Sequence, residues 1–228
     1  VDNTDNFDVK TILDGVEVDS QINVVDSAAL VPNDYVTFKA ATLALTAGAP
    51  LTGGSNGTGA DTGTPHQAAL DDLEMYGYNT LLALTNEDTI KSLYIEYGKR
   101  MRYDVGAKFQ VVVYNANTPD NETVINVKNG AIGEDEEIFG GVYWTGGVSA
   151  GVNVNASNTN RVYDGEHTLD MSTTNTQTKL VTALADGFYT FHRVGDQIRV
   201  LRDINSFVTF APDKNEDFSN NQVIRVID

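Results

Sequence analysis

Residues 79–115 carry the clearest signal for a fold class in this chain: NTLLALTNEDTIKSLYIEYGKRMRYDVGAKFQVVVYN. This stretch opens with a short apolar run suited to a buried strand and closes with another, KFQVVVYN, at residues 108–115. Between them, apolar side chains recur at the spacing of an amphipathic helix: Ile90, Leu93, Tyr94 and Tyr97. Thr85 or Asn86 can cap this helix. A β-α-β order predicts parallel strands in a covered sheet, with the helix as the crossover.

The flanking segments continue the alternation of helices and strands. A helix is predicted to start at Pro65, and TVINVKNG, residues 123–130, reads as a further strand. The acidic run Glu134–Glu137 opens a helical stretch through residue 154, because carboxylates favour a helix N-terminus. A helix over residues 174–187 ends at Gly187, and residues 188–204 form a hairpin turning at Gly195.

The expected fold class is therefore α/β, or α+β overall, with a mixed sheet covered by helices. Small residues in the glycine-rich helix should let it pack closely against a neighbour: Gly140, Gly141, Gly146, Gly147, Ala150 and Gly151.

Composition suggests where the chain divides. Residues 1–47 form a small strand-rich piece, with strands in KTILDGVEV, QINVV and NDYVTFKAATLAL; in the last, Val36, Phe38 and Ala40 share one face. Residues 48–65 are mostly Gly, Thr, Ser, Asn and Ala, which predicts a linker loop. Residues 66–219 form the α/β domain, and residues 220–228 start a helix without a cap or breaker after it. We expect both ends to continue in a longer protein.

Charge and cysteine content exclude several classes of function. The 228 residues carry 15 Lys and Arg against 32 Asp and Glu, a formal net charge of −17. This charge repels phosphates, so neither nucleic acid nor an anionic membrane surface is expected as a partner. Without cysteine, disulfides, zinc-thiolate sites and thiol nucleophiles are excluded. No apolar run reaches the ~18 residues of a membrane span, and no signal peptide is recognisable.

Two loops look at first like ligand sites. Gly57, Gly59 and Gly63 resemble a dinucleotide-binding signature, but the spacing is one residue too wide and no strand leads into it. The stretch Asp213–Asp217 begins like a calcium loop. Its sixth position is Phe218 instead of Gly and its twelfth is Ile224 instead of Glu, so the sharp turn and the bidentate ligand are missing. We interpret both as ordinary loops.

Other residues with possible chemistry are scattered. His66, His167 and His192 lack the i+4 spacing of a metal-binding face. Glu134–Glu137 are adjacent and so cannot flank a substrate as glycosidase carboxylates do. Trp144, the sole tryptophan, sits among apolar and glycine residues that suit a core. Glycosylation patterns begin at Asn56, Asn121 and Asn155, but nothing argues for a glycosylating host. We predict no catalytic, cofactor-binding or metal-binding residues.

Several further blocks of sequence are informative together: LTGGSNG, ALDDLEMYGYNTLLALT, GKRMRYDVGAKFQVVVYN, ETVINVKNG and VYWTGGVSAGVNVNASNTNRVYDGE. In one consistent order over residues 34–228, they resemble the tail sheath proteins of contractile phages, particularly those of prophages and phage-tail-like bacteriocins of Gram-positive bacteria. The most specific is DINSFVTFAPDKNEDFSNNQVIRVID, residues 203–228, which is similar to the sheath segment that enters a C-terminal domain.

This resemblance implies a structural subunit and no enzyme or cofactor. Residues 1–47 would be part of an outer piece and residues 66–219 the sheath middle domain. The implied partners are other sheath subunits in hexameric rings, the tail tube protein and the baseplate, in a virion tail assembled in the bacterial cytoplasm. Two alternatives remain: a ligand- or glycan-binding surface module, and an enzyme with a doubly wound sheet that uses strand-end groups such as Thr85 or Asn115.

Overall fold

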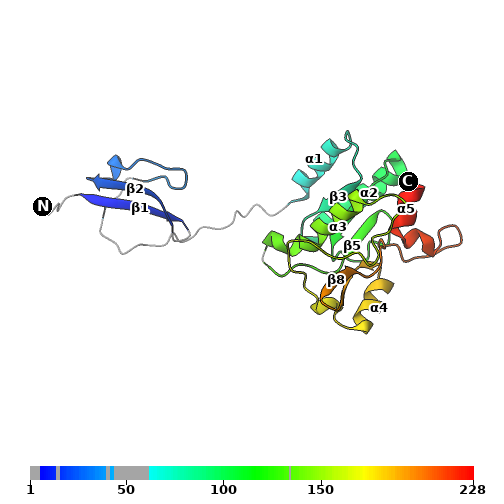
Figure 1. Ribbon diagram of the computed structural model, residues 1–228. Helices are drawn as coiled ribbons and strands as arrows, with labels where there is room; N and C mark the ends of the chain where they lie inside the picture. The colour runs from blue at the N-terminus through cyan, green and yellow to red at the C-terminus, as the bar shows by residue number, and fades with distance from the viewer. Residues whose placement is uncertain (1–5, 14–15, 40–41, 44–61, 134) are drawn as a thin grey trace. The chain divides into compact units, whose positions relative to one another are not determined.

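A computed structural model describes residues 6–13, 16–39, 42–43, 62–133 and 135–228 (Figure 1). The chain divides into two compact units, residues 1–58 and 59–228. Gly57 and Gly59 of the glycine loop lie outside the described residues, as do Asn56 and Ala40.

The first unit is built on one antiparallel hairpin, β1 (Phe7–Leu13) and β2 (Val16–Val24), followed by a 3-10 turn at Ser27–Ala29. The strands predicted from KTILDGVEV are confirmed. The strand predicted around Val36 and Phe38 is wrong, because residues 33–39 form a loop. The side chain of Asn33 accepts the backbone N–H groups of Tyr35 and Val36, which gives this segment local partners in place of a sheet ladder.

The second unit contains a four-stranded sheet in the order β3-β4-β5-β6, parallel throughout (Figure 1). The strands are β3 (Thr80–Ala83), β4 (Gln110–Tyr114), β5 (Val124–Val127) and β6 (Phe188–Tyr189). The α/β fold class and the β-α-β unit of residues 79–115 are confirmed.

Parallel and antiparallel pairing occur in separate sheets, whereas the sequence predicted one mixed sheet. The predicted hairpin at Gly195 is present as β7 (Phe191–Val194) and β8 (Gln197–Val200). The chain leaves the parallel sheet after Tyr189 because the side chain of Asn129 accepts the backbone N–H of Phe191 at 3.0 Å.

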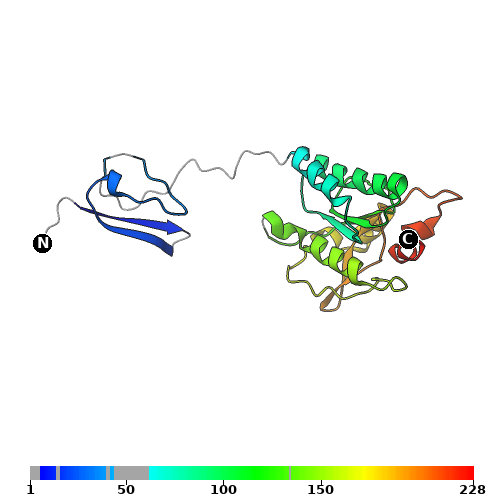
Figure 2. The ribbon, with the colours of Figure 1, turned by 90° about the horizontal axis from the view of Figure 1, so that it is seen from above.

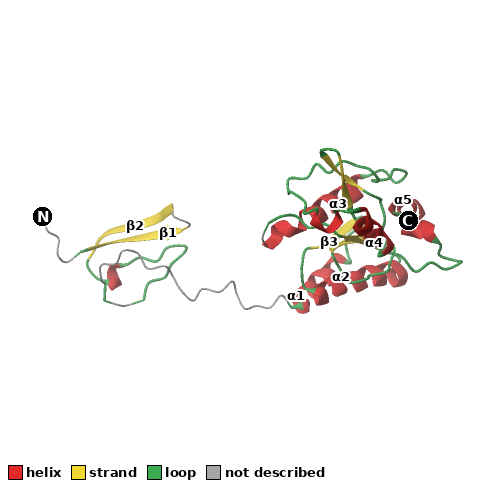
Figure 3. Ribbon diagram, turned by 90° about the horizontal axis from the view of Figure 1, so that it is seen from below, coloured by secondary structure: helices red, strands yellow, loops and turns green. Residues whose placement is uncertain are grey.

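Helices α1 (Gly63–Leu73) and α2 (Asp88–Arg100) lie on one side of the sheet, and α3 (Gly140–Gly151) lies on the other (Figures 2 and 3). Strand β4 contributes side chains to the cores on both faces of the sheet. Val111 and Val113 pack in the core beneath α1 and α2, and Val112 packs in the core with α3. All three valines are fully buried. Apolar layers on both faces of β4, whose first four residues are buried, stabilise the unit.

Helix starts differ from the predicted ones by one or two residues. Helix α1 begins at Gly63 and not at Pro65; Pro65 lies in the first turn, where its missing N–H group is not needed. The N-cap of α2 is Glu87, not Thr85 or Asn86. Thr85 instead bonds to the N-cap residue, because its hydroxyl accepts the N–H of Glu87 at 3.1 Å.

The helical stretch predicted from Glu134 through residue 154 is shorter in the structure: a 3-10 turn at Asp135–Phe139 leads into α3, which ends at Gly151, and Glu134 lies outside the described residues. The predicted close packing is confirmed at three glycines, where an added Cβ would collide with a neighbouring group. At Gly140 this group is His167, and at Gly146 it is Leu82. At Gly141 the Cβ would lie 2.5 Å from the backbone oxygen of Asn129. The prediction of close packing is wrong at three exposed residues on the outer side of the helix: Gly147, Ala150 and Gly151.

A π-helix, Met101–Val105, follows α2 directly, and the remaining α-helices are α4 (Gln177–Ala185) and α5 (Asn221–Ile227). Helix α4 is capped by Thr176, and the chain reverses at Gly187 with φ 75°, as predicted. Short 3-10 turns occupy Ser172–Thr174 and Glu216–Ser219. Among the described helices, none has both the length and the apolar composition for a membrane crossing.

Candidate functional site

A network of buried polar groups lies where residues 203–228 return to the amino ends of the parallel strands. Ser206 donates its backbone N–H at 2.8 Å to the carbonyl oxygen of Val124, the first residue of β5. The hydroxyl of Ser206 also donates to Asn121 O at 3.0 Å. We call residues 203–228 and their partners on residues 102–103 and 110–124 the C-terminal joint.

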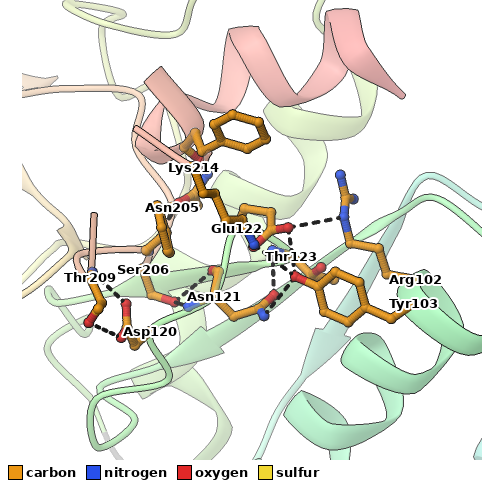
Figure 4. Close-up of polar contacts among 12 residues, drawn as sticks. Arg102, Tyr103, Asp120, Asn121, Glu122, Thr123, Asn205, Ser206, Thr209 and Lys214 are labelled. Carbon is orange, nitrogen blue, oxygen red and sulfur yellow. Dashed lines mark hydrogen bonds and ion pairs between the residues drawn. The ribbon is translucent and has the colours of Figure 1, made fainter. Parts of the chain in front are cut away.

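Glu122 is the charged centre of this joint (Figure 4). Its Oε2 accepts from Lys214 Nζ at 2.7 Å, and its Oε1 accepts from the Tyr103 hydroxyl at 2.6 Å. Arg102 Nε lies 3.6 Å from the same Oε1. The side chains of Arg102 and Glu122 are each 4% exposed, so this pair is shielded from water. Its charges are balanced within the protein and hold segments far apart in sequence together.

Lys214 also contacts aromatic rings. Its ammonium lies 5.4 Å from the centroid of Tyr103, 5.0 Å from Phe207 and 6.0 Å from Phe218. Cation–π attraction adds to the ion pair with Glu122. Lys214 therefore fastens the loop before α5 to the body of the domain.

The two charges keep each other ionised. Burial alone would raise the pKa of Glu122, but the hydrogen bonds from Lys214 and Tyr103 hold it below its ordinary value. Burial alone would lower the pKa of Lys214, but hydrogen bonds to Glu122 and Tyr103 raise it. Both pKa values are shifted away from neutral pH, which does not favour Glu122 or Lys214 as a general acid or base.

Asp120 fastens the start of the returning segment in the same way. Its Oδ1 accepts the N–H groups of Val208 and Thr209 at 2.8 and 3.0 Å, and its Oδ2 accepts the Thr209 hydroxyl at 2.5 Å (Figure 4). Burial opposes ionisation of Asp120, yet these hydrogen bonds lower its pKa. The carboxylate thus replaces the ladder partners that this extended segment lacks.

Helix α5 is held mainly by polar groups. Arg102 donates twice to Asp228, at 2.9 and 2.5 Å, and Arg225 pairs with Asp203 at 2.8 Å. Asn221 accepts from Gln110 at 2.8 Å and donates to Asp203 at 2.9 Å. A helix of seven residues is unstable alone, so these contacts and the buried Ile224 determine whether it forms.

The joint lies at the amino ends of the strands, whereas ligand sites in open α/β sheets lie beyond the carboxyl ends. At the carboxyl ends of the strands, the Thr85 hydroxyl accepts the Glu87 N–H, and the Asn115 side chain accepts from Lys128 at 2.9 Å. The Lys128 ammonium in turn lies 4.2 Å from the ring of Phe188. The strand-end groups considered for an enzyme are thus engaged in structural contacts.

The three histidines are placed separately. His66, on α1, lies 3.0 Å from the Tyr94 hydroxyl on α2, and His167 stacks on Tyr143. His192 is in β7, where burial and the charge of Arg199 lower its pKa. Within the described part of the chain, no group of three or more metal-ligating side chains forms.

The other residues singled out in the sequence have structural contacts. Trp144 donates to Asp164 at 2.6 Å and packs against Tyr163 and Phe191. In Asp213–Asp217, Asn215 caps the following 3-10 turn by accepting the Asp217 N–H. Asn121 is buried within the joint, which leaves no room for a glycan.

The joint itself was not predicted from the sequence. Arg102 and Asp228 are 126 positions apart, and Glu122 and Lys214 are 92 apart, so no local spacing connects them. The one available signal was the similarity of residues 203–228 to a specific segment of sheath proteins.

Comparison with known proteins gives consistent matches. The model for the phage tail sheath protein central domain matches residues 59–206. The phage-like element PBSX protein XkdK of Bacillus subtilis is 33% identical over 98% of this chain and 52% of its own length. This chain therefore spans about half the length of that relative.

Solved structures agree with this match. The sheath tail protein of Desulfitobacterium hafniense is 36% identical, with a TM-score of 0.69 over 100% of this chain and 55% of that one. The sheath tail protein of Listeria innocua is 27% identical, with a TM-score of 0.65 over 99% of this chain and 52% of that one.

Proposed function

Since this chain belongs to the phage tail sheath proteins, we propose that it forms the body of a subunit of a contractile tail sheath. The observation that carries the proposal is the likeness, along the entire chain, to a solved sheath tail protein at 36% identity. Residues 1–47 would be part of an outer piece, 48–65 a linker, 66–219 the middle domain and 220–228 the helix that leads onward.

In this proposal, subunits form hexameric rings that stack around the tail tube and attach to the baseplate. The assembly takes place in the bacterial cytoplasm and yields a tail of a phage, a prophage or a phage-tail-like bacteriocin. Contraction drives the tube through the host envelope. The energy comes from intersubunit contacts that are weaker in the extended lattice than in the contracted one, so neither nucleotide hydrolysis nor a cofactor is required.

The joint supports a mechanical role for the second unit. Its buried ion pairs specify one arrangement of residues 203–228 on the sheet, and breaking such a pair is strongly unfavourable. A body with this attachment moves as a unit when force is applied through α5. We therefore propose that rearrangement occurs between subunits and not inside residues 59–228.

Expression of the open reading frame that encodes this chain, followed by negative-stain electron microscopy, tests the assignment. Striated tubes or stacked rings are expected. Dispersed monomers that bind glycans on an array would instead support the surface-module alternative.

The charge of −17 adds a second test. If acidic faces oppose each other across rings, added salt screens their repulsion, because exposed charges interact over only ~8 Å at physiological ionic strength. The threshold for contraction should then shift with ionic strength. A sheath whose threshold is the same at low and high salt would contradict this arrangement.

A further inference from the structure

The arginines of this chain fall into two groups. Three of the seven pair with carboxylates: Arg100 with Glu74, Arg102 with Asp228 and Arg225 with Asp203. The other four form no ion pair within the part of the chain that the structure describes, and all lie between residues 161 and 202: Arg161, Arg193, Arg199 and Arg202. In a chain with more than twice as many acidic as basic residues, this group of arginines without carboxylate partners is a local exception.

Three of these four arginines lie on one small antiparallel sheet. Residues 160–163 extend the β7–β8 hairpin beside β8, where the N–H of Val200 donates to Arg161 O at 2.9 Å. Arg193 is on β7 and Arg199 is on β8. We call residues 160–163, β7 and β8, with these three arginines, the arginine sheet.

Carboxylates that are close by along the chain do not pair with the arginine sheet. Asp164, Glu166 and Asp196 form no ion pair with its arginines among the described residues. Arg199 donates instead to the carbonyl oxygen of Asn160 at 3.0 Å, which carries no full charge. Arg193 is exposed, close to the turn of the hairpin. The arginine sheet therefore presents positive charge to its surroundings.

Helices α1 and α2 carry the opposite charge. Their basic side chains all pair with nearby carboxylates: Lys91 with Asp88, Lys99 with Glu96 and Arg100 with Glu74. At the end of α1, Asp71 and Asp72 are exposed and form no ion pair in the described part of the chain. Directly after them, Met75 is 79% exposed and Tyr76 is 65% exposed. We call residues 71–76 the acidic end of α1.

The two charged surfaces lie on opposite sides of the second unit. Helices α1 and α2 cover the core that contains Val111 and Val113, whereas Phe191 and Val200 of the arginine sheet pack in the core with α3 (Figures 2 and 3). The two surfaces therefore meet only between different molecules. A contact between two different surfaces of identical subunits is head-to-tail, and its repetition generates rings or helical filaments.

We propose that the arginine sheet of one copy of this chain binds the acidic end of α1 in the next copy. This contact rests on the proposed function, because it requires identical subunits in repeated contact. Complementary charge favours this pairing and disfavours contact between two like surfaces. Arginine, tyrosine and methionine are enriched at protein interfaces, and guanidinium groups stack on aromatic rings. The exposed Met75 and Tyr76 thus suit the arginines as the carboxylates do.

Charge reversal in the complete protein tests this contact. Arg193→Glu and Asp72→Arg each bring like charges together, so each should raise the protein concentration required for tube formation about tenfold. The two substitutions together exchange the charges and should restore tube formation near the wild-type concentration. Both residues are exposed, so circular dichroism should show the wild-type fold in every variant. Recovery in the double variant also separates lost contact from misfolding.

Lys108→Glu is the matched control, because Lys108 is also an exposed cation but lies outside both surfaces. It should leave the required concentration unchanged. A rise equal to that of Arg193→Glu would show that net charge governs assembly, which would overturn the contact. Wild-type tubes that are indifferent to Arg193→Glu, or a double variant no better than the worse single one, would also overturn it. A wild-type protein that forms no tubes would overturn the proposed function and this contact with it.

Discussion

Glu122→Gln is the substitution that most directly probes the C-terminal joint. The variant keeps the shape of the side chain and an oxygen that can accept from Tyr103. It removes the charge that faces Lys214 at 2.7 Å and Arg102 at 3.6 Å, and it can place an amide N–H₂ against the lysine. We expect the variant to fold with lower stability.

The structure sets the magnitude. Removing one partner of a fully buried ion pair costs about 3–5 kcal/mol, because the other charge is left uncompensated. Glu122 is 4% exposed, but Lys214 is 29% exposed and can turn its ammonium toward water. We therefore expect a loss of about 2–3 kcal/mol in the free energy of unfolding.

Glu96→Gln is a closely matched control. Lys99 lies 2.8 Å from Glu96 and is also 29% exposed, but Glu96 itself is 69% exposed. An exposed pair of this kind contributes about 0–0.5 kcal/mol. The two variants thus remove a carboxylate charge at nearly the same distance from a lysine. Glu122 differs from Glu96 in its burial and in its additional contacts with Tyr103 and Arg102.

Urea denaturation followed by the fluorescence of Trp144, the sole tryptophan, measures both variants in the second unit. Equal losses for Glu122→Gln and Glu96→Gln would show that burial of the Glu122 carboxylate and its additional contacts have no energetic consequence.

Three further predictions use the same denaturation assay. Folding lowers the pKa of Glu122, so the stability that this carboxylate contributes is present above its ordinary pKa of 4.5 and is lost as pH falls through the lower pKa of the folded state. The difference in unfolding free energy between wild type and Glu122→Gln should therefore shrink below pH 4.5. A difference that does not change with pH would contradict this. Gly141→Ala should cost about 1–3 kcal/mol, because its Cβ would lie 2.5 Å from the Asn129 oxygen, whereas Gly147→Ala, in open space, should stabilise by up to about 1 kcal/mol; the same sign for both would rule out this packing. Asn129→Ala should cost about 2–4 kcal/mol, because it leaves the buried N–H of Phe191 without its acceptor; a loss under about 1 kcal/mol would show that the amide is not needed.

Local patterns predicted much of the second unit. The helical spacing of Ile90 and Tyr97 between two apolar runs was sufficient for the β-α-β unit, and Gly187 marked the end of α4. These features depend on neighbours within a few residues, where periodicity and turn chemistry operate.

Features that depend on distant partners were not predictable in this way. Asn129 ends the parallel sheet by accepting the N–H of Phe191, 62 positions away, and no local pattern signals that contact. Gly146 and Gly147 are adjacent and identical in type, yet only Gly146 meets a neighbour. The joint at Glu122 is of the same kind, because Glu122 and its partners come from three separate segments, at residues 102–103, 122 and 214.

Cryo-electron microscopy of the assembled sheath, in its extended and contracted states, would show whether the second unit moves as one body. We expect helical tubes in which residues 59–228 fit both reconstructions without internal change, with Lys214 bound to Glu122 and α5 docked in each. An assembly that is not tubular, or tubes in which residues 203–228 leave the sheet in one state, would contradict it.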